Sequence, residues 1–145
     1  MVNKEIALTN KKEKLMNLLI NIDVPDLEPA INFYSNAFGL KLNRMLDDDV
    51  AELTGASSTI YLLKKDEGST CSKNTIQTRS YQRHWTPIHF DIVVEDIWQA
   101  TERVVSAGAT IETECSEWRE SKCITFFDPF GHGFCLIEFE RGTYG

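Results

Sequence analysis

The chain has 145 residues, of which 42% are hydrophobic and 26% charged, a composition normal for one soluble globular domain with its own core. Its formal net charge of −7 argues against nucleic acid as the main partner, because no basic face can dominate the surface. No apolar run is long enough to span a bilayer, and the charged N-terminus lacks the apolar core of a secretory signal. We therefore expect a cytoplasmic protein with no membrane partner.

The cysteines show no CxxC or Cys/His spacing of the zinc-site type. We interpret all of them as reduced and structural, and Cys135 as a small buried hydrophobe in a strand. The four positions are Cys71, Cys115, Cys123 and Cys135.

Residues 1–14 form a charged tail, and residues 15–64 are predicted to be a first module of one strand, one helix and three strands. Pro25-Asp26 opens the helix, whose apolar residues recur at helical spacing, and Gly39 ends it in the C-terminal capping position. The predicted strands of this module cover residues 15–24, 40–44, 50–53 and 59–63.

Residues 65–84 are polar and carry almost no apolar side chains, which is typical of a lid or of a disordered linker. Residues 85–145 repeat the order of the first module, with a helix opened by Glu95-Asp96 and ended by Gly108. The predicted strands of this second module cover residues 88–94, 110–114, 122–127 and 133–140.

The two strand-to-helix units match each other at a constant offset of 70 residues, which indicates an internal repeat. The sequence therefore predicts an α+β fold of two tandem βαβββ modules that together form one domain. The matched pairs are Val24 and Val94, Asp26 and Asp96, Leu27 and Ile97, Ala30 and Ala100, and Ala37 and Ala107.

Two segments, VPDLEPAINFYSNAFGLKL and FDPFGHGFCLIEF, resemble motifs of the vicinal oxygen chelate superfamily, which includes glyoxalase I, bleomycin-resistance proteins, fosfomycin-resistance enzymes and extradiol dioxygenases. The first carries the superfamily's Asp26, Phe33, Tyr34 and Gly39, and the second resembles its D-P-x-G turn before a strand that ends in glutamate. The resemblance runs from Leu15 to Glu140 and is specific for the fold rather than the reaction. It implies two curled mixed sheets, each forming a half-open cup.

Metalloenzymes of this superfamily place metal ligands on the first and fourth strands of a module. The resemblance assigns these positions to His89 and Glu138 in the second module, whereas the first module has Leu19 and Tyr61 (or Leu62) there. Two of the four expected ligands are therefore missing, and two ligands hold an ion weakly. We expect no complete metal site and no cofactor; a bound metal would be held by His89 and Glu138.

Without a metal, His89 and Glu138 could face each other across the cup as a hydrogen-bonded pair, as a general acid-base couple or as a polar anchor for a ligand. The sequence does not choose among these roles. By strand alternation Phe139 is expected to face the helix, opposite to Glu138, and Tyr61 to face the cup. Two further histidines are expected to be solvated: His84 and His132.

The resemblance is closest to the bleomycin-resistance branch, whose members bind a ligand in aromatic-lined grooves of a homodimer. We therefore predict a homodimeric small-molecule-binding protein for an aromatic or cationic ligand, and the negative charge fits a cation. The predicted ligand-binding residues are Leu19, Tyr61, His89 and Glu138.

Two other functions stay open at this point. One is a glyoxalase-like or fosfomycin-resistance-like lyase or transferase that depends on a divalent metal, held by His89, Glu138 and a third ligand. The other is a structural or regulatory dimer whose cup is filled by its own side chains. No catalytic residue is assigned.

Overall fold

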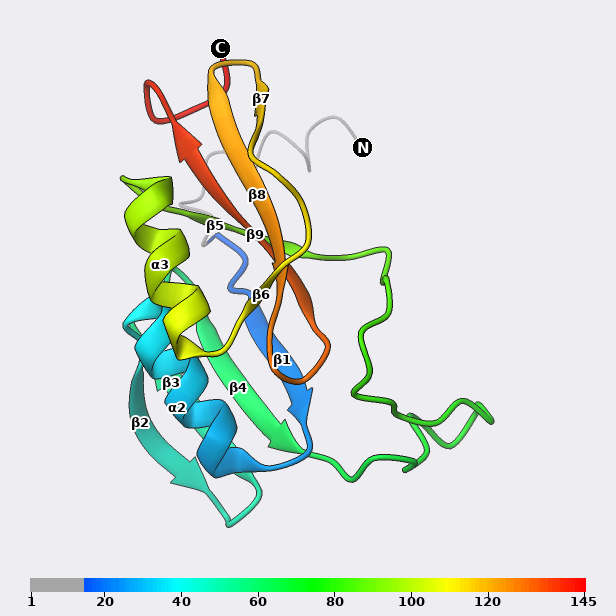
Figure 1. Cartoon of the computed structure of the whole chain (residues 1–145). Helices are drawn as coiled ribbons and strands as arrows, with labels where there is room; N and C mark the ends of the chain where they lie inside the picture. The colour runs from blue at the N-terminus through cyan, green and yellow to red at the C-terminus, as the bar shows by residue number, and fades with distance from the viewer. Residues whose placement is uncertain (1–14) are drawn as a thin grey trace, which may run out of the picture.

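The computed structural model describes residues 15–145 (Figure 1), and the predicted tail of residues 1–14 lies outside this range. Two sheets, each with its own helix, succeed each other along the chain. This arrangement confirms the predicted α+β fold of two βαβββ modules. Neither helix of the described part is long and apolar enough to cross a membrane.

The first module forms a four-stranded sheet in the order β1-β4-β3-β2, with β1 parallel to β4 and the other neighbours antiparallel. Strand β1 begins at Leu19 rather than at the predicted Leu15, because Leu19 pairs with Thr59, the first residue of β4. The residues before it have no strand to pair with. The elements are β1 (Leu19–Val24), α2 (Leu27–Phe38), β2 (Lys41–Leu46), β3 (Val50–Thr54) and β4 (Thr59–Lys64).

The second sheet has the order β5-β9-β8-β6, and β7 also pairs with β8. The predicted single strand 110–114 was wrong, because β6 and β7 are separate. The backbone N–H groups of Glu112 and Thr113 both point at the carbonyl of Thr125 (2.8 and 3.4 Å), so two residues oppose one and the ladder is interrupted. The elements are β5 (Phe90–Val93), α3 (Ile97–Ala107), β6 (Thr110–Ile111), β7 (Ser116–Trp118), β8 (Ser121–Phe127) and β9 (Gly133–Phe139).

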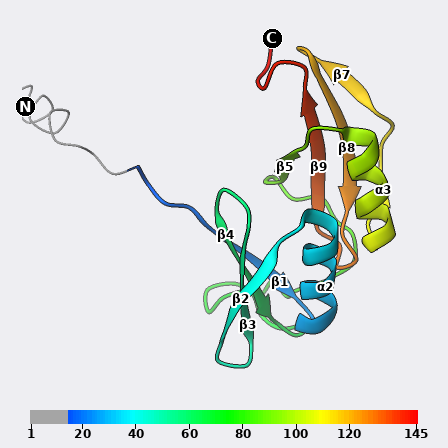
Figure 2. The ribbon, with the colours of Figure 1, turned by 90° about the vertical axis from the view of Figure 1, so that its left-hand side faces the viewer.

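The helices begin and end where local chemistry predicts. The Asp96 carboxylate accepts hydrogen bonds from the backbone N–H groups of the second and third residues of α3, Trp98 and Gln99 (3.0 and 3.1 Å). Gly39 ends α2 in the left-handed conformation, with φ of 70°. The helices lie side by side on one flank of the molecule (Figure 2), and Arg103 Nε of α3 donates to the carbonyl of Ala37 at the end of α2 (2.9 Å).

Aromatic side chains join the two modules in one core. Phe38 of α2 meets Phe134 of β9 edge to face, with ring centroids 5.2 Å apart. Phe134 in turn stacks on the fully buried Phe126 of β8, at 5.3 Å and an interplanar angle of 11°. The first helix is thereby fixed against the second sheet.

The turn Asp128–Gly131 is tied to α2 through one buried carboxylate. Asp128 accepts the hydroxyl proton of Tyr34 (2.6 Å) and the backbone N–H groups of Phe130 and His132 (both 2.9 Å). Burial, followed by the Asp128 charge, raises the pKa of Tyr34 well above its ordinary value, so this hydroxyl stays protonated and donates. The carboxylate therefore fixes both the turn and its distance from the helix.

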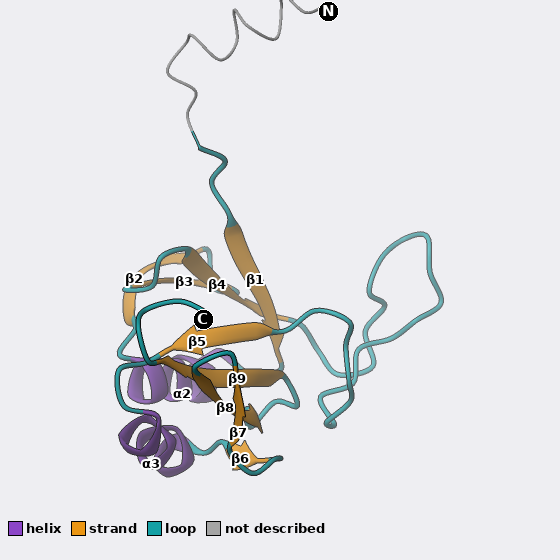
Figure 3. Cartoon of the chain, turned by 90° about the horizontal axis from the view of Figure 1, so that it is seen from above, coloured by secondary structure: helices purple, strands orange, loops and turns teal. Residues whose placement is uncertain are grey.

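Residues 65–84 form no helix or strand apart from an isolated bridge between Thr70 and Thr78. Their middle part projects away from the two helices (Figure 3), but their ends are bound to the modules. Arg79 Nε pairs with Asp23 Oδ2 at 2.7 Å, and the backbone N–H of Lys65 donates to the carbonyl of Val24 (2.9 Å). Both attachments lie beside the C-terminal end of β1.

Candidate functional site

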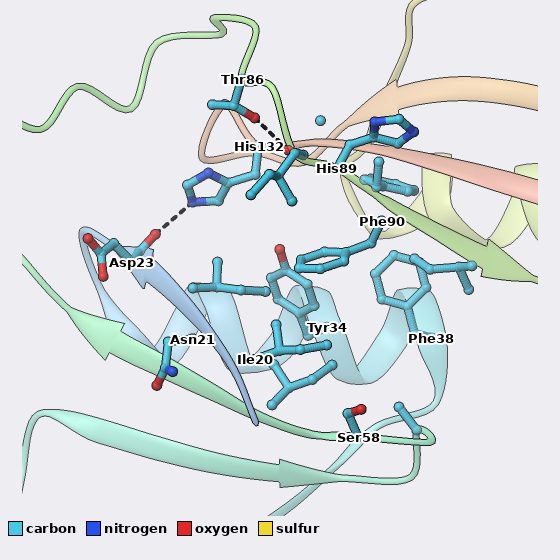
Figure 4. Close-up of a pocket in the computed structure, with 18 of the residues that line it drawn as sticks. Ile20, Asn21, Asp23, Tyr34, Phe38, Ser58, Thr86, His89, Phe90 and His132 are labelled. Atoms are coloured by element: carbon cyan, nitrogen blue, oxygen red, sulfur yellow. Dashed lines mark hydrogen bonds between the residues drawn. The ribbon is translucent and has the colours of Figure 1, made fainter. Parts of the chain in front are cut away.

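A groove of about 870 Å³ lies between the two modules, beside β1 and β5, each of which is an edge strand of its sheet in the described part of the chain. Its floor comes from α2, and its walls come from both sheets (Figure 4). Much of the lining is apolar or aromatic: Ile20 and Ile22 of β1, Tyr34 and Phe38 of α2, Phe90 of β5 and Phe134 of β9.

One end of the groove is polar and is built around the end of β1. The side-chain carboxylate of Asp23 is paired with Arg79. The backbone carbonyl oxygen of Asp23 lies 2.6 Å from Nε2 of His132. His132 is half-buried and meets the Tyr81 ring edge to face (6.2 Å, 84°). The expectation that His132 is solvated was therefore wrong: the buried turn directs its ring into the structure. Burial, followed by the Asp23 charge, raises the pKa of Tyr81 to about 12.

His89 is the one residue of the four predicted ligand-binding positions that lines this groove. It lies just before β5, its side chain is 55% exposed, and its Nε2 lies 3.3 Å from Oδ1 of Asp91. Asp91 also lines the groove. The pair projects from the free edge of the second sheet.

Glu138 faces the opposite way, and the expected pairing of His89 with Glu138 across a cup is wrong. Oε1 of Glu138 accepts the backbone N–H of Ile97 at the start of α3 (2.9 Å), and Oε2 lies 3.7 Å from Nζ of Lys122. A carboxylate is stabilised at the positive end of a helix dipole. Glu138 shares its face with the fully buried Leu136, under the helix.

Phe139 was expected to face the helix, and this is wrong as well. As the neighbour of Glu138 in the strand, it points to the opposite face of the sheet. Its ring meets Tyr144 edge to face at 4.8 Å, on the face away from α3. The residue of β9 that shares a face with Asp91 is Cys135, because these two are direct partners in the parallel β5–β9 ladder. As predicted, Cys135 is buried, and the four cysteines are free thiols.

Tyr61 and Leu19 lie outside the lining of the groove. Tyr61 alternates with the fully buried Leu62 and so points away from α2, as expected, where its hydroxyl donates to Oε2 of Glu52 (2.9 Å). Leu19 is exposed at the beginning of β1. The structure thus separates these two positions from His89 rather than gathering them in one site.

The family model of the glyoxalase-like domain matches residues 19–137, which run from the first residue of β1 into β9. The chain belongs to the glyoxalase-like domain family. This places it in the vicinal oxygen chelate superfamily that the two sequence motifs resemble.

Solved structures share the fold of this glyoxalase-like protein at low sequence identity. A glyoxalase/bleomycin resistance protein/dioxygenase from Nocardioides is 16% identical, with a TM-score of 0.65 over 99% of this chain and 95% of that one. Lactoylglutathione lyase from Agrobacterium tumefaciens is 18% identical, with a TM-score of 0.60 over 88% and 96%. A variant of the fosfomycin resistance protein FosX from Listeria monocytogenes, complexed with Mn(II) and a dihydroxypropylphosphonic acid, is 23% identical, with a TM-score of 0.63 over 85% and 90%.

A divalent-metal site held by His89 and Glu138, on which the lyase or transferase alternative rests, does not fit this glyoxalase-like domain. The two side chains lie on opposite faces of the second sheet, so they cannot share one ion. Glu138 is also committed to α3 and Lys122. The lyase or transferase alternative therefore loses the ligand pair on which it depended.

Sequence reasoning missed one buried carboxylate in the first module. Glu52 accepts hydrogen bonds from Asn43 Nδ2 (2.7 Å), Arg44 Nε (3.0 Å) and the Tyr61 hydroxyl (2.9 Å). These bonds, with Arg44 the largest cause, lower the pKa of Glu52 to about 2. In VAELT (residues 50–54), strand alternation puts Glu52 on the face opposite to Ala51 and Leu53. A basic residue on the preceding strand, Arg44, could then have been proposed as its partner.

Replacing Glu52 by Gln should weaken the folded state near neutral pH and change its acid response. Because the folded-state pKa is depressed from 4.5 to about 2, the carboxylate stabilises the fold above about 4.5 and loses this contribution as the pH falls towards about 2. Urea unfolding at a series of pH values measures the free energy of unfolding of the wild type and of the Glu52→Gln variant. The difference between the two should shrink as the pH falls. Glu117→Gln, on the exposed strand β7, is the matched control. A Glu52→Gln variant that differs from the wild type by the same amount at every pH would contradict this account.

Proposed function

We propose that this glyoxalase-like protein binds a small aromatic or cationic molecule in the groove between its modules. The observation that carries the proposal is the groove itself, whose volume of about 870 Å³ lies within the roughly 300–1,000 Å³ usual for ligand pockets. The relative from Nocardioides, named in part for bleomycin resistance, supports the same class of function.

The aromatic lining favours a flat ring as the ligand. Phe90 is 42% exposed while contributing to the groove wall, so its ring is accessible to a bound molecule. Phe38 and Tyr34 lie below it (Figure 4). A planar ligand would gain stacking and apolar burial from these three side chains.

The charges around the groove favour a cation. Asp91 has a side chain that is 38% exposed, and its only charged contact in the described chain is with His89. Asp23 is already paired with Arg79, so the two carboxylates and the one guanidinium together carry a net negative charge. Aromatic faces also attract cations within about 6 Å of the ring centroid. Together with the net charge of −7, this supports a cationic ring system.

Fluorescence titration with ethidium, a planar aromatic cation, tests this proposal in the metal-free protein. We expect saturable binding of one ethidium per groove, weakened several-fold by Phe90→Ala. Trp98→Ala removes another exposed aromatic side chain, on α3 and outside the groove, and should leave binding unchanged. Anilinonaphthalene sulfonate, an aromatic anion, should bind more weakly. Absence of saturable ethidium binding, or equal losses of ethidium affinity in both variants, would reject the proposal.

We also propose that the protein is a homodimer in which a second copy covers the free edges β1 and β5. Ile88, two residues before β5, is 76% exposed, Val93 of β5 is 64% exposed, and Leu19 of β1 is 60% exposed. Open edge strands with apolar side chains pair readily with another chain. Sedimentation should give twice the 16.5 kDa of the chain, and Val93→Lys should shift it towards the monomer. A wild-type monomer at all concentrations would contradict the proposal.

A further inference from the structure

Between residues 66 and 79 the linker doubles back on itself beside the polar end of the groove (Figure 3). Three residues of this segment line the groove: Cys71, Thr78 and Arg79. We propose that residues 66–79, called the flap below, form a hinged gate that swings away from the groove to let a ligand enter and leave. The gate serves the proposed ligand-binding function and rests on it, but its motion is measurable without ligand.

Hydrogen bonds within the flap hold its two arms together. The backbone N–H of Arg79 donates to the carbonyl of Ser69 (2.8 Å), and that of Cys71 donates to the carbonyl of Gln77 (3.0 Å). The guanidinium of Arg79 adds two bonds from Nη1, to Oγ of Ser69 (3.1 Å) and to the carbonyl of Thr70 (2.7 Å). These bonds move with the flap, so a change in its position leaves its own structure intact.

No apolar packing holds the flap against the modules. None of its residues is buried, and its one large apolar side chain, Ile76, is 98% exposed. Segments with few buried apolar contacts open at a lower free energy than the core does. The flap can therefore move while the shared core of the two modules stays folded.

A single side chain fastens the flap to the first module. Arg79 Nε pairs with Asp23 Oδ2 at the end of β1 (2.7 Å), and the two side chains are 15% and 35% exposed. No other hydrogen bond or ion pair joins residues 66–79 to a helix or strand of the described chain. Because the Asp23 carboxylate is partly open to solvent, water can replace the guanidinium, and exposed ion pairs contribute little to stability. The contact between Arg79 and Asp23 is therefore a latch that can open.

The base of the flap is fixed, which confines the hinges to a few residues. The Tyr81 hydroxyl donates to the carbonyl of Lys65 (2.6 Å), and the N–H of Lys65 donates to the carbonyl of Val24 at the end of β1 (2.9 Å). The flap begins directly after Lys65, and Ser80 alone separates it from Tyr81. A few loop residues of this kind are sufficient to absorb a hinge rotation.

The linker beyond the hinge is anchored to the second module and cannot follow the flap. Arg83 donates from Nε and Nη2 to both carboxylate oxygens of Glu112, and the two side chains are 16% and 14% exposed. Its guanidinium lies over Gly133, where an added Cβ would be 2.6 Å from Nη2, and 4.3 Å from the ring centroid of Trp85. A bidentate ion pair of this kind is stronger and geometrically more specific than a single contact. The linker thus has a mobile half and a fixed half.

The latch is expected to control rates. A ligand that passes the flap in both directions needs the latch to open for entry and for release, so a weaker latch speeds up both steps. A side chain that only contacted the ligand would behave differently, because its loss would mainly speed up release. The two rate constants therefore distinguish a gate from a contact.

The motion is tested without ligand, by NMR on protein that carries a nitroxide on Cys71, the exposed thiol of the flap. The double variant Asp23→Asn/Arg79→Gln removes the latch while the summed charge of the two side chains stays at zero. We expect the wild type to show strong relaxation enhancement of amide signals at the end of β1, and the double variant to show several-fold less. Cys71→Ser, treated in the same way, corrects for nitroxide on the other cysteines. Equal enhancement in the wild type and the double variant would overturn the inference.

The gating is tested by stopped-flow fluorescence with ethidium. In the double variant we expect the association and dissociation rate constants to rise together, each several-fold. Glu120→Gln is the matched control, because it removes another ion pair, that with Arg141 (3.8 Å), outside the groove, and it should leave both rate constants unchanged. Faster dissociation alone, or unchanged rates, would overturn the gate. If ethidium does not bind to the wild type, the proposed function fails, and the nitroxide measurement still decides whether the flap moves.

Discussion

Asp128→Ala is expected to lower the free energy of unfolding by about 3 kcal/mol or more. The buried Asp128 carboxylate is the partner of the Tyr34 hydroxyl and of two backbone N–H groups in the turn. Each buried donor left without an acceptor costs about 1–3 kcal/mol. Chemical denaturation of the variant and the wild type measures the loss.

A double-mutant cycle with Tyr34→Phe isolates the contact between α2 and the turn. The loss from Tyr34→Phe should be much smaller in the Asp128→Ala background than in the wild type, because the acceptor is already gone. Asp26→Ala is the control, since the Asp26 side chain makes no capping hydrogen bond at the start of α2. Additive effects of the two substitutions would show that the 2.6 Å contact does not couple them.

Phe126→Ala is expected to cost about 3–5 kcal/mol, the usual loss for a buried phenylalanine. Phe126 is fully buried on β8 and stacks on Phe134, which contacts α2 through Phe38. The substitution therefore leaves a cavity where the two modules share their core. Denaturant unfolding and calorimetry should both report the loss, and the groove floor should loosen with it.

Trp98→Ala provides the control for Phe126→Ala, because Trp98 is 56% exposed on α3 and exposed substitutions usually stay within about 0.5 kcal/mol. If Phe126→Ala lowered the free energy of unfolding by as little as Trp98→Ala does, the two modules would not depend on a shared aromatic core.

Local chemistry explains why the helices and the turn were predictable. The Asp96 carboxylate and Gly39 mark helix ends by interactions within a few residues, and the repeat at an offset of 70 follows from equivalent buried positions such as Ala30 and Ala100. The Asp128–Gly131 turn is likewise a local structure. These features need no knowledge of which strands pair.

The orientation of Glu138 could not be obtained in the same way. Alternation shows that Glu138 and Phe139 face opposite sides, but not which side carries the helix. That choice depends on α3 starting beside the end of β9, where the N–H of Ile97 meets the carboxylate. His132 was misjudged for a related reason, because its partner Asp23 lies 109 residues away.

The groove depends on the separation of two free strand edges, which no sequence pattern specifies. Of the predicted ligand-binding positions, only His89 borders it, while Tyr61 is engaged by Glu52 on the first sheet. The residue boundaries of the modules, the cytoplasmic location and the absence of a nucleic-acid partner stay predictions.

The most direct test of the central proposal is to map the ethidium site by NMR on isotopically labelled protein. If the groove is the binding site, amide and side-chain shifts should concentrate at β1, β5 and the part of α2 that carries Tyr34 and Phe38. Shifts confined to the face of the first sheet around Tyr61 and Glu52, or an absence of specific shifts at saturating dye, would contradict it.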